Sequence, residues 1–243
     1  MMRRVLCVVA LAFTIGVPSS AQQLASDQDR RAALEFYRRG AELMTAEQFE
    51  KAAEEFTKAI EKDPLMTLAH YQLGQSYMNL QRYASAIKSY QDCIRASETL
   101  FQLGASNRFE VEKRRDQEIQ EMRDSIVAYQ RAGHPLLATK AEQHLRDLEN
   151  ERSHLNQTFR PQPEVLLALG SAHFRNGDRD SALAEWRGAV EGNPKLGEAH
   201  NNLAVIYMLT GQKNEAENSV KLAEKAGFRV NPQLKADIKK LRD

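Results

Sequence analysis

The side chains best suited to catalysis or metal binding are few in this sequence and widely spaced. Its 243 residues include six histidines and two cysteines. Four histidines are scattered between residues 134 and 173 (His134, His144, His154 and His173), and no two histidines stand four residues apart, as in a zinc site on one helix. No serine nucleophile elbow, Walker loop or glycine-rich phosphate fingerprint occurs. The sequence therefore predicts a protein that is not an enzyme and that binds no metal ion or other cofactor.

Charged side chains make up 28% of the residues, but their charges nearly cancel. The formal net charge is +1, which provides no general electrostatic attraction for nucleic acid or anionic lipid. One stretch, EKRRDQE (Glu112–Glu118), contains three consecutive bases, but the segment Arg108–Arg160 around it contains ten bases and ten acids. Such a balance is typical of a solvated helix face. We therefore expect no nucleic-acid partner.

The N-terminus has the three parts of a secretory signal peptide. Met1–Arg4 is basic, Val5–Val17 is apolar, and Pro18–Ala21 ends in small residues that suit cleavage after Ala21. The apolar run is too short to span a bilayer comfortably, so cleavage is preferred to an uncleaved membrane anchor. We expect residues 1–21 to be removed and the mature protein, with no integral membrane segment, to be periplasmic or secreted.

A pattern of small, aromatic and proline residues recurs every 34 residues. In LALGSAHFRNGDRDSALAEWRGAVEGNP (Leu167–Pro194), a glycine is followed at fixed distances by alanine, tryptophan, alanine and proline. When Pro163 is position 1 of a unit, Gly197 begins the next unit, and Ala33 and Thr67 begin two earlier ones. The residues at positions 8, 20 and 27 are then Gly40, Ala52, Ala59; Gly74, Ala86, Cys93; Gly170, Ala182, Ala189; and Ala204, Ala216, Ala223. Four units in two tandem pairs resemble the tetratricopeptide repeat family.

Each 34-residue unit is expected to form two antiparallel helices. Small side chains at positions 8, 20 and 27 let the helix backbones approach, larger ones at positions 4, 11 and 24, such as Trp186, fill the space between helices, and proline at position 32 suits the end of a unit. His70 and His200 both take position 4 and are expected to pack in the core or at its rim. The resemblance implies an all-α solenoid of helical hairpins, with units 1 and 2 over residues 33–100 and units 3 and 4 over residues 163–230.

The segment between the two pairs of units, residues 101–162, predicts a hairpin insertion of two long, charged helices. Apolar residues recur on one helical face on both sides of the breaker Gly133-His134-Pro135. This central hairpin is expected either to project from the solenoid or to stack within it. Residues 231–243 predict one further helix, whose polar face would cap the C-terminal end of the solenoid.

The resemblance also implies a binding surface, the concave groove that is lined by the first helix of each unit. Carried over by position, the candidate groove residues are Tyr37, Arg38, Tyr71, Gln72, Gln75, Asn79, Asn201 and Asn202. Tyrosine offers contact area at a low entropic cost, and glutamine and asparagine can bond to the backbone of an extended peptide. The expected partner is therefore a peptide or protein segment, held mainly by residues 33–100.

The sequence favours an exported interaction module or assembly scaffold, but it leaves two alternatives open. The chain could be an accessory or catalytic subunit of an envelope enzyme complex, with a site that the sequence does not reveal. It could also form a homo-oligomer through the central hairpin.

Overall fold

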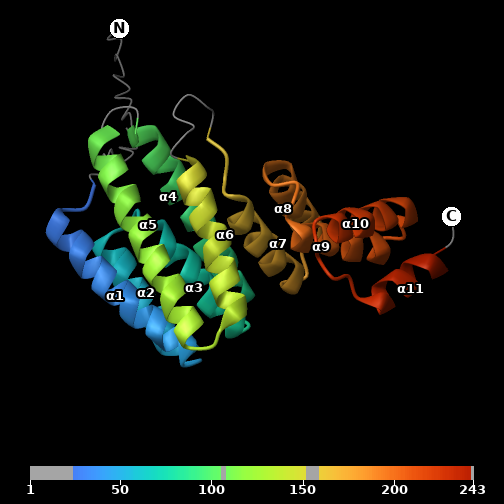
Figure 1. The fold of residues 1–243 in the computed structure, drawn as a ribbon, viewed down its shortest axis with the longest axis horizontal. Coiled ribbons are helices and arrows are strands. Elements are labelled where there is room, and N and C mark those ends of the chain that lie inside the picture. The colour runs from blue at the N-terminus through green and yellow to red at the C-terminus, as the bar shows by residue number, and fades with distance from the viewer. Residues whose placement is uncertain (1–23, 105–107, 152–158, 242–243) are drawn as a thin grey trace, which may run out of the picture.

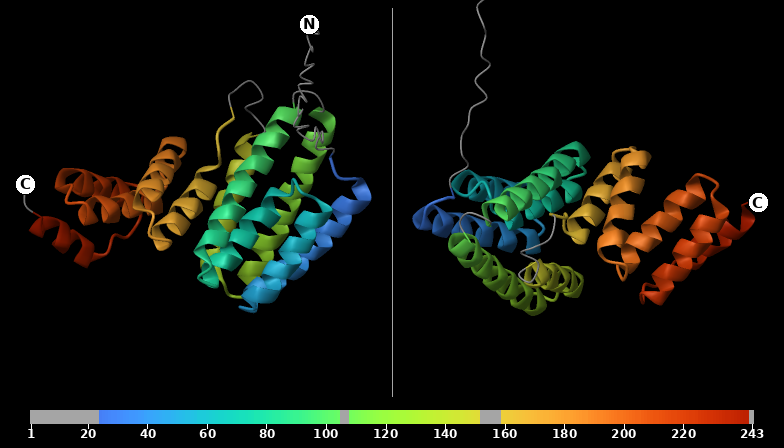
Figure 2. Two further views of the ribbon diagram at one scale, coloured as in Figure 1. Left: turned by 180° about the vertical axis from the view of Figure 1, so that it is seen from behind. Right: turned by 90° about the horizontal axis from the view of Figure 1, so that it is seen from above.

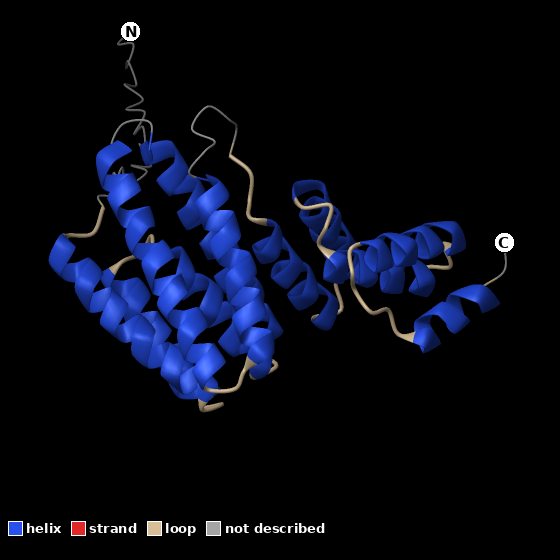
Figure 3. Ribbon diagram, in the orientation of Figure 1, coloured by secondary structure: helices blue, strands red, loops and turns tan. Residues whose placement is uncertain are grey.

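The structure is a computed structural model that describes residues 24–104, 108–151 and 159–241. This part of the chain forms eleven helices and contains no strand (Figures 1 and 3). The prediction of an all-α fold is confirmed. The predicted signal peptide, residues 1–21, lies outside the described residues and stays a prediction.

Each of the four predicted repeat units is a pair of packed helices. Their bounds are α1 (Asp27–Thr45) with α2 (Phe49–Lys62), α3 (Thr67–Asn79) with α4 (Tyr83–Gly104), α7 (Pro163–Arg175) with α8 (Arg179–Gly192), and α9 (Gly197–Leu209) with α10 (Lys213–Lys225). Helix α4 continues four residues beyond the expected end of unit 2, and α11 (Pro232–Lys240) packs against α9 and α10 at the C-terminal end. Ile238 of α11 is buried there.

Close helix crossings occur where the repeat places small residues. A Cβ atom added to Gly170 would lie 2.6 Å from the ring of Trp186, and one added to Gly74 would lie 2.5 Å from the ring of Tyr90. The position-8 glycine thus gives room to the position-24 aromatic of the same unit. Trp186 is 3% exposed, and its indole N–H donates to the Leu167 carbonyl oxygen over 3.2 Å. The predicted burial of Trp186 between helices is confirmed.

The two position-4 histidines join consecutive units. Nε2 of His70 lies 2.9 Å from the carbonyl oxygen of Pro64, and Nε2 of His200 lies 3.0 Å from that of Pro194. Each proline ends the preceding unit, so the histidine ring bonds to a backbone group that the turn would otherwise leave without a partner. Both side chains are buried, which agrees with the packing role expected from the sequence.

The segment 101–162 contains α5 (Arg108–Arg131) and α6 (Pro135–Glu151), which pack against each other. This hairpin lies across the α1–α3 face of the N-terminal repeats, while the C-terminal repeats extend away from it (Figures 1 and 2). Helix α4 packs directly against α7, so unit 3 follows unit 2 without interruption. The hairpin therefore neither projects from the solenoid nor stacks within it. It covers part of the concave side, an arrangement that the sequence analysis did not include.

The hairpin shares a core with the N-terminal repeats. Ile119, Met122 and Ile126 of α5 are buried in one cluster with Tyr37 and Met44 of α1. These α5 residues belong to the apolar stripe that the sequence shows. Their burial explains why the stripe exists: it faces the repeats.

Candidate functional site

The candidate groove residues of unit 1 contact the hairpin. The Arg38 guanidinium donates from Nε to Glu121 of α5 over 2.9 Å, and its Nη2 pairs with the other oxygen of the same carboxylate. Tyr37 is 1% exposed, and burial raises the pKa of its phenol well above the usual value. Helix α5 thus buries Tyr37, whereas Arg38 pairs with α5 while its side chain remains 57% exposed.

Two candidates from unit 2 also contact the hairpin. Gln72 Nε2 donates to the Tyr129 hydroxyl oxygen over 3.3 Å. The Tyr71 ring meets the His144 ring of α6 edge-on, with 5.1 Å between centroids. His144 is buried, and desolvation lowers the pKa of its imidazole to about 4. This histidine is therefore a neutral part of the interface near pH 7.

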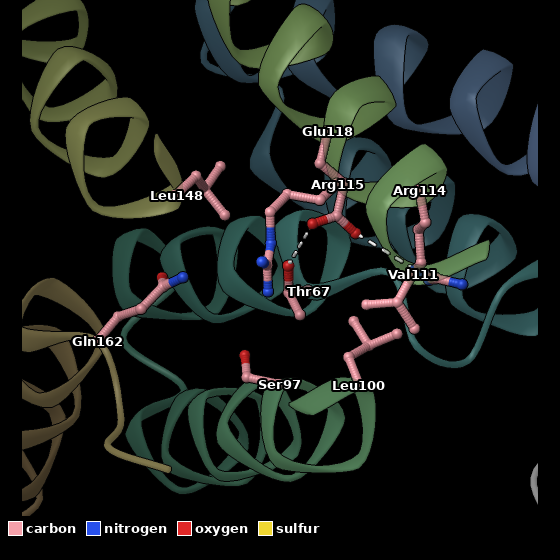
Figure 4. Close-up of a pocket in the computed structure, with 9 residues that line it drawn as sticks. All are labelled: Thr67, Ser97, Leu100, Val111, Arg114, Arg115, Glu118, Leu148 and Gln162. Carbon is pink, nitrogen blue, oxygen red and sulfur yellow. Dashed lines mark hydrogen bonds and ion pairs between the residues drawn. The ribbon is translucent and has the colours of Figure 1, made fainter. Parts of the chain in front are cut away.

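A buried polar seam runs between α5 and the start of α3 (Figure 4). The Arg114 side chain is 3% exposed, with Nη2 2.6 Å from Oδ2 of Asp63 and Nε 3.6 Å from Oε1 of Glu118. Thr67 Oγ1 donates to Glu118 over 3.2 Å. Burial raises the pKa of the Glu118 carboxyl to about 7, although the nearby Arg114 lowers it. The cavity at this seam has a volume of about 20 Å³, too small for a peptide side chain.

This seam corrects one expectation from the sequence. The stretch Glu112–Glu118 was expected to be a solvated helix face, but Arg114 and Glu118 are buried. The expectation was wrong for these two residues because Asp63 and Thr67, about fifty positions earlier in the chain, provide partners for them.

Asp63 distinguishes the two halves of the molecule. Its side chain accepts a hydrogen bond from the backbone N–H of Leu65 over 3.2 Å, and Asn193, at the equivalent junction, accepts one from Lys195 over 3.1 Å. An acid and an amide thus form the same turn. Only Asp63 also carries the charge that binds Arg114.

The concave side remains open beyond the hairpin. A cavity of about 500 Å³ lies among α3, α6, α7 and α9. We call it the open groove. Its lining residues are Tyr71, Gln75, Met78, Tyr90, Lys140, Gln143, Glu164, Leu167, Ala168, Ser171, Phe174, Arg175, Trp186, Glu198, Asn202 and Val205.

The open groove brings together three of the eight candidate groove residues, namely Tyr71, Gln75 and Asn202. Asn79 is exposed, and its amide donates to the Gln75 carbonyl oxygen over 3.0 Å. Asn201 is half-buried and does not line the cavity. The open surface is therefore centred on units 2 to 4 rather than on residues 33–100.

Two acidic residues of the open groove were missed in the sequence analysis. Glu164 and Glu198 both stand at position 2 of their units, a groove position in the repeat. The signal was present, because the same position holds Leu34 and Leu68 in the N-terminal units. Where an acid replaces leucine at the same repeat position, its side chain is expected to face a polar neighbour rather than an apolar one.

The acids lie at one end of the open groove. Burial raises the pKa of the Glu164 carboxyl to about 7, against the opposing effects of the Asn193 amide and Arg146. Tyr71 lines the same groove, and burial raises the pKa of its phenol, with smaller contributions from the charges of Glu164 and Glu198.

The structure and the repeat pattern agree with a known family. The tetratricopeptide repeat model matches residues 37–99 and 167–227, about half of the chain. The chain belongs to the tetratricopeptide repeat family. Proteins of this family are generally interaction modules without enzymatic activity, and membership of the family supports a role in protein–protein interaction or assembly.

Individual relatives match this tetratricopeptide repeat protein only in part. The photosystem I assembly protein Ycf3 of Rippkaea orientalis is 38% identical over 60 residues, which cover 25% of this chain and 35% of the relative. The chain thus spans about a third of that protein. Among solved structures, it is similar to PilW, a widely conserved type IV pilus biogenesis factor, at 16% identity and a TM-score of 0.42, covering 87% of this chain and 86% of PilW. It is also similar to YrrB, described as a TPR protein with an unusual peptide-binding site, at 20% identity and a TM-score of 0.32, covering 88% and 94% of the two chains.

The described residues, 24–104, 108–151 and 159–241, contain neither a metal-binding cluster nor a membrane-spanning helix. Within these ranges no group of three or more histidine, cysteine, aspartate or glutamate side chains is placed to hold a metal ion. No helix in the same ranges is long and apolar enough to cross a membrane.

Proposed function

We propose that the protein is an exported, non-enzymatic interaction module that binds a peptide or protein segment in the open groove. The observation that carries this proposal is the contrast along the concave side: the groove is open over units 2 to 4 and is covered by α5 over unit 1. A surface that the chain does not cover itself is available to a partner.

The lining of the open groove suits a peptide. Leu167, Phe174 and Val205 offer apolar contact area, and Gln75 and Asn202 add amide groups that can bond to a peptide backbone. A volume of about 500 Å³ is in the usual range for a binding pocket, which is mostly apolar with a few polar groups. No cofactor is needed for this kind of recognition.

Export of the protein is proposed from the sequence of the first 21 residues. A basic start, a short apolar run and small residues before the cleavage site are the features that support it. N-terminal sequencing of the mature protein is expected to begin within a few residues of Gln22. An intact Met1 on a membrane-embedded protein would contradict export as a cleaved protein.

Photocrosslinking in the native envelope tests the groove. A photoreactive amino acid at Asn202, in the open groove, is expected to yield a discrete adduct whose crosslinked peptide maps to one segment of the partner. The control position is Lys221, which is exposed on α10 and does not line the cavity. Adducts of equal yield from both positions, or from Lys221 alone, would rule out the open groove as the binding surface.

Self-association and membership of an enzyme complex stay predictions. The buried stripe of α5, which includes Ile119, Met122 and Ile126, is already in contact with α1 and α3. These residues are therefore not available to a second copy while the hairpin is docked. This placement favours the groove over the hairpin as the interaction surface.

A further inference from the structure

We infer that the part of the open groove lined by Glu164, Glu198 and Tyr71 is a binding site for a cationic side chain, a lysine or arginine of the bound segment. This inference rests on the proposed function, because it names the chemistry that the bound peptide must carry.

The burial of Glu164 is the first reason. The residue is 6% exposed, and within the described part of the chain neither carboxylate oxygen makes a hydrogen bond of normal geometry. Burial raises the pKa of its carboxyl more than the Asn193 amide and Arg146 lower it, so these neighbours do not fully compensate the charge. It nevertheless lines the open groove. An ionised carboxylate that is buried without a partner is strongly unfavourable. A cation arriving from the groove would supply the missing partner.

The repeat itself supplies the second reason. Position 2 holds Leu34 and Leu68 where the hairpin covers the concave side, and it holds Glu164 and Glu198 where the groove is open. The leucines show that an apolar side chain satisfies the packing of this repeat. The acids are therefore not required for the fold, and both occur where a ligand can reach them.

Tyr71 provides the third reason. Its ring is fixed by edge-on contact with His144, at 5.1 Å, and by contact with Tyr90, at 5.7 Å between centroids, and it also lines the groove. A cation that sits against a tyrosine ring gains from the ring quadrupole in addition to the carboxylate charges. Arginine can also pair with a carboxylate through two parallel hydrogen bonds.

A base at the other end of α7 gives an expected orientation for the bound segment. Arg175 is the last residue of α7, whereas Glu164 is the second, and both line the groove. Eleven residues of helix separate Glu164 from Arg175, which corresponds to about 16 Å. An extended peptide spans this distance in about five residues. We expect the bound segment to carry its base near Glu164 and an acidic group about five residues away, near Arg175.

Defined peptide pools test the cation site. The full mature chain is immobilised and exposed to N-acetylated nine-residue random peptides in which one position is fixed as arginine, lysine, citrulline or norleucine. The arginine and lysine pools should be retained at least tenfold more than the other two. Glu164→Gln should reduce this ratio to near one. The matched control is Glu191→Gln, which removes the same charge from an exposed residue outside the groove.

The outcomes separate the inference from the proposed function. If all pools bind the wild type equally, or if Glu164→Gln keeps the preference, the cation site is wrong and peptide binding stands. If no pool binds, both are wrong.

The thermal midpoint of unfolding provides a folding control. Glu164→Gln should raise this midpoint at pH 8, because the variant removes an unpaired buried charge. A lower midpoint would show that a group within the protein already holds the carboxylate, which would also overturn the inference.

Discussion

The N-terminal and C-terminal pairs of repeats share one 34-residue pattern but present different concave surfaces. The N-terminal pair is covered over unit 1 and the start of unit 2 by its own hairpin, which fills the place of a ligand there with Glu121, Tyr129 and the apolar residues of α5. The C-terminal pair remains open and carries acids at position 2. The residues that form the repeat are the same in both halves, so the difference lies in the side chains that face the groove. A repeat pattern therefore determines the scaffold and leaves the surface to a few other positions.

The polar seam explains how the hairpin selects one of the two pairs. Buried ion pairs add little net stability, because desolvation offsets their attraction, but breaking one by removing a single partner is costly. Arg114 finds Asp63 at the junction before unit 2, whereas the junction before unit 4 has Asn193 at the same place. The seam thus determines where the hairpin docks on the repeats more than how tightly it docks.

The largest effect is expected from the core of the open half. Trp186→Ala removes the side chain that fills the space between α7 and α8, and it should lower the free energy of unfolding by about 3–5 kcal/mol. Urea denaturation followed by circular dichroism measures the loss, since Trp186 is the single tryptophan. Hydrogen exchange should show that the loss falls on α7 to α10. A loss below about 1 kcal/mol would mean that the site collapses or that Trp186 is not in the core.

A smaller effect is expected at the junction that distinguishes the two halves. Asp63→Asn keeps the turn, as Asn193 shows, but leaves Arg114 with only the more distant carboxylate of Glu118, 3.6 Å away. We expect hydrogen exchange in α5 to accelerate by an amount equivalent to about 2–3 kcal/mol, with exchange in α9 unchanged.

Asp92→Asn is the control for this variant. It removes the same charge from α4, where Asp92 pairs with the exposed Arg95. If the two variants change exchange in α5 equally, the Asp63–Arg114 pair does not hold the hairpin.

The smallest effect concerns the pH dependence of hairpin docking. The folded pKa of Glu118, about 7, lies above the usual 4.5 of a glutamate carboxyl, so its contribution to docking is complete below pH 4.5 and is lost as the pH rises through 7. The folded pKa of His144, about 4, lies below 6.5, so its contribution is complete above 6.5 and is lost as the pH falls through 4. The two contributions oppose each other between these limits.

Glu118→Gln should remove this compensation. In this variant the free energy of hairpin docking should weaken by up to about 2 kcal/mol as the pH falls from 6.5 to 4.5. In the wild type the free energy of docking should change little over the same range. Hydrogen exchange of α5 at the two pH values, corrected for the intrinsic exchange rate, measures the difference. A variant whose docking strengthens on acidification would contradict the assignment to His144.

The sequence predicts the repeats well because their contacts are local. Gly170 contacts Trp186 sixteen residues later, and this spacing recurs in each unit that has a glycine at position 8 and an aromatic residue at position 24. The place of the hairpin could not be predicted, since its polar seam joins Arg114 to Asp63 across about fifty residues. The residues next to Arg114 in the sequence are the same whether its side chain is buried or exposed, so they do not reveal its burial.

The candidate site was predicted in part for the same reason. Tyr71, Gln75 and Asn202 follow from repeat positions alone, and they line the open groove. Tyr37 and Arg38 satisfy the same positional rule, but the hairpin buries Tyr37 and pairs with Arg38 through Glu121. A rule about position in a repeat identifies which face a residue lies on, and it gives no information about a segment folded back over that face.

The protection of two matched cysteines tests the central claim that one concave face is closed and the other open. Thr67→Cys places a thiol under α5, where Thr67 is 3% exposed, and Ser171→Cys places one in the open groove; the native Cys93 is fully buried. Maleimide labelling of the native protein should be at least about a hundredfold slower at residue 67, which corresponds to a local opening free energy of about 3 kcal/mol. Equal labelling rates at the two positions would show that the hairpin does not close the N-terminal face and would contradict the account.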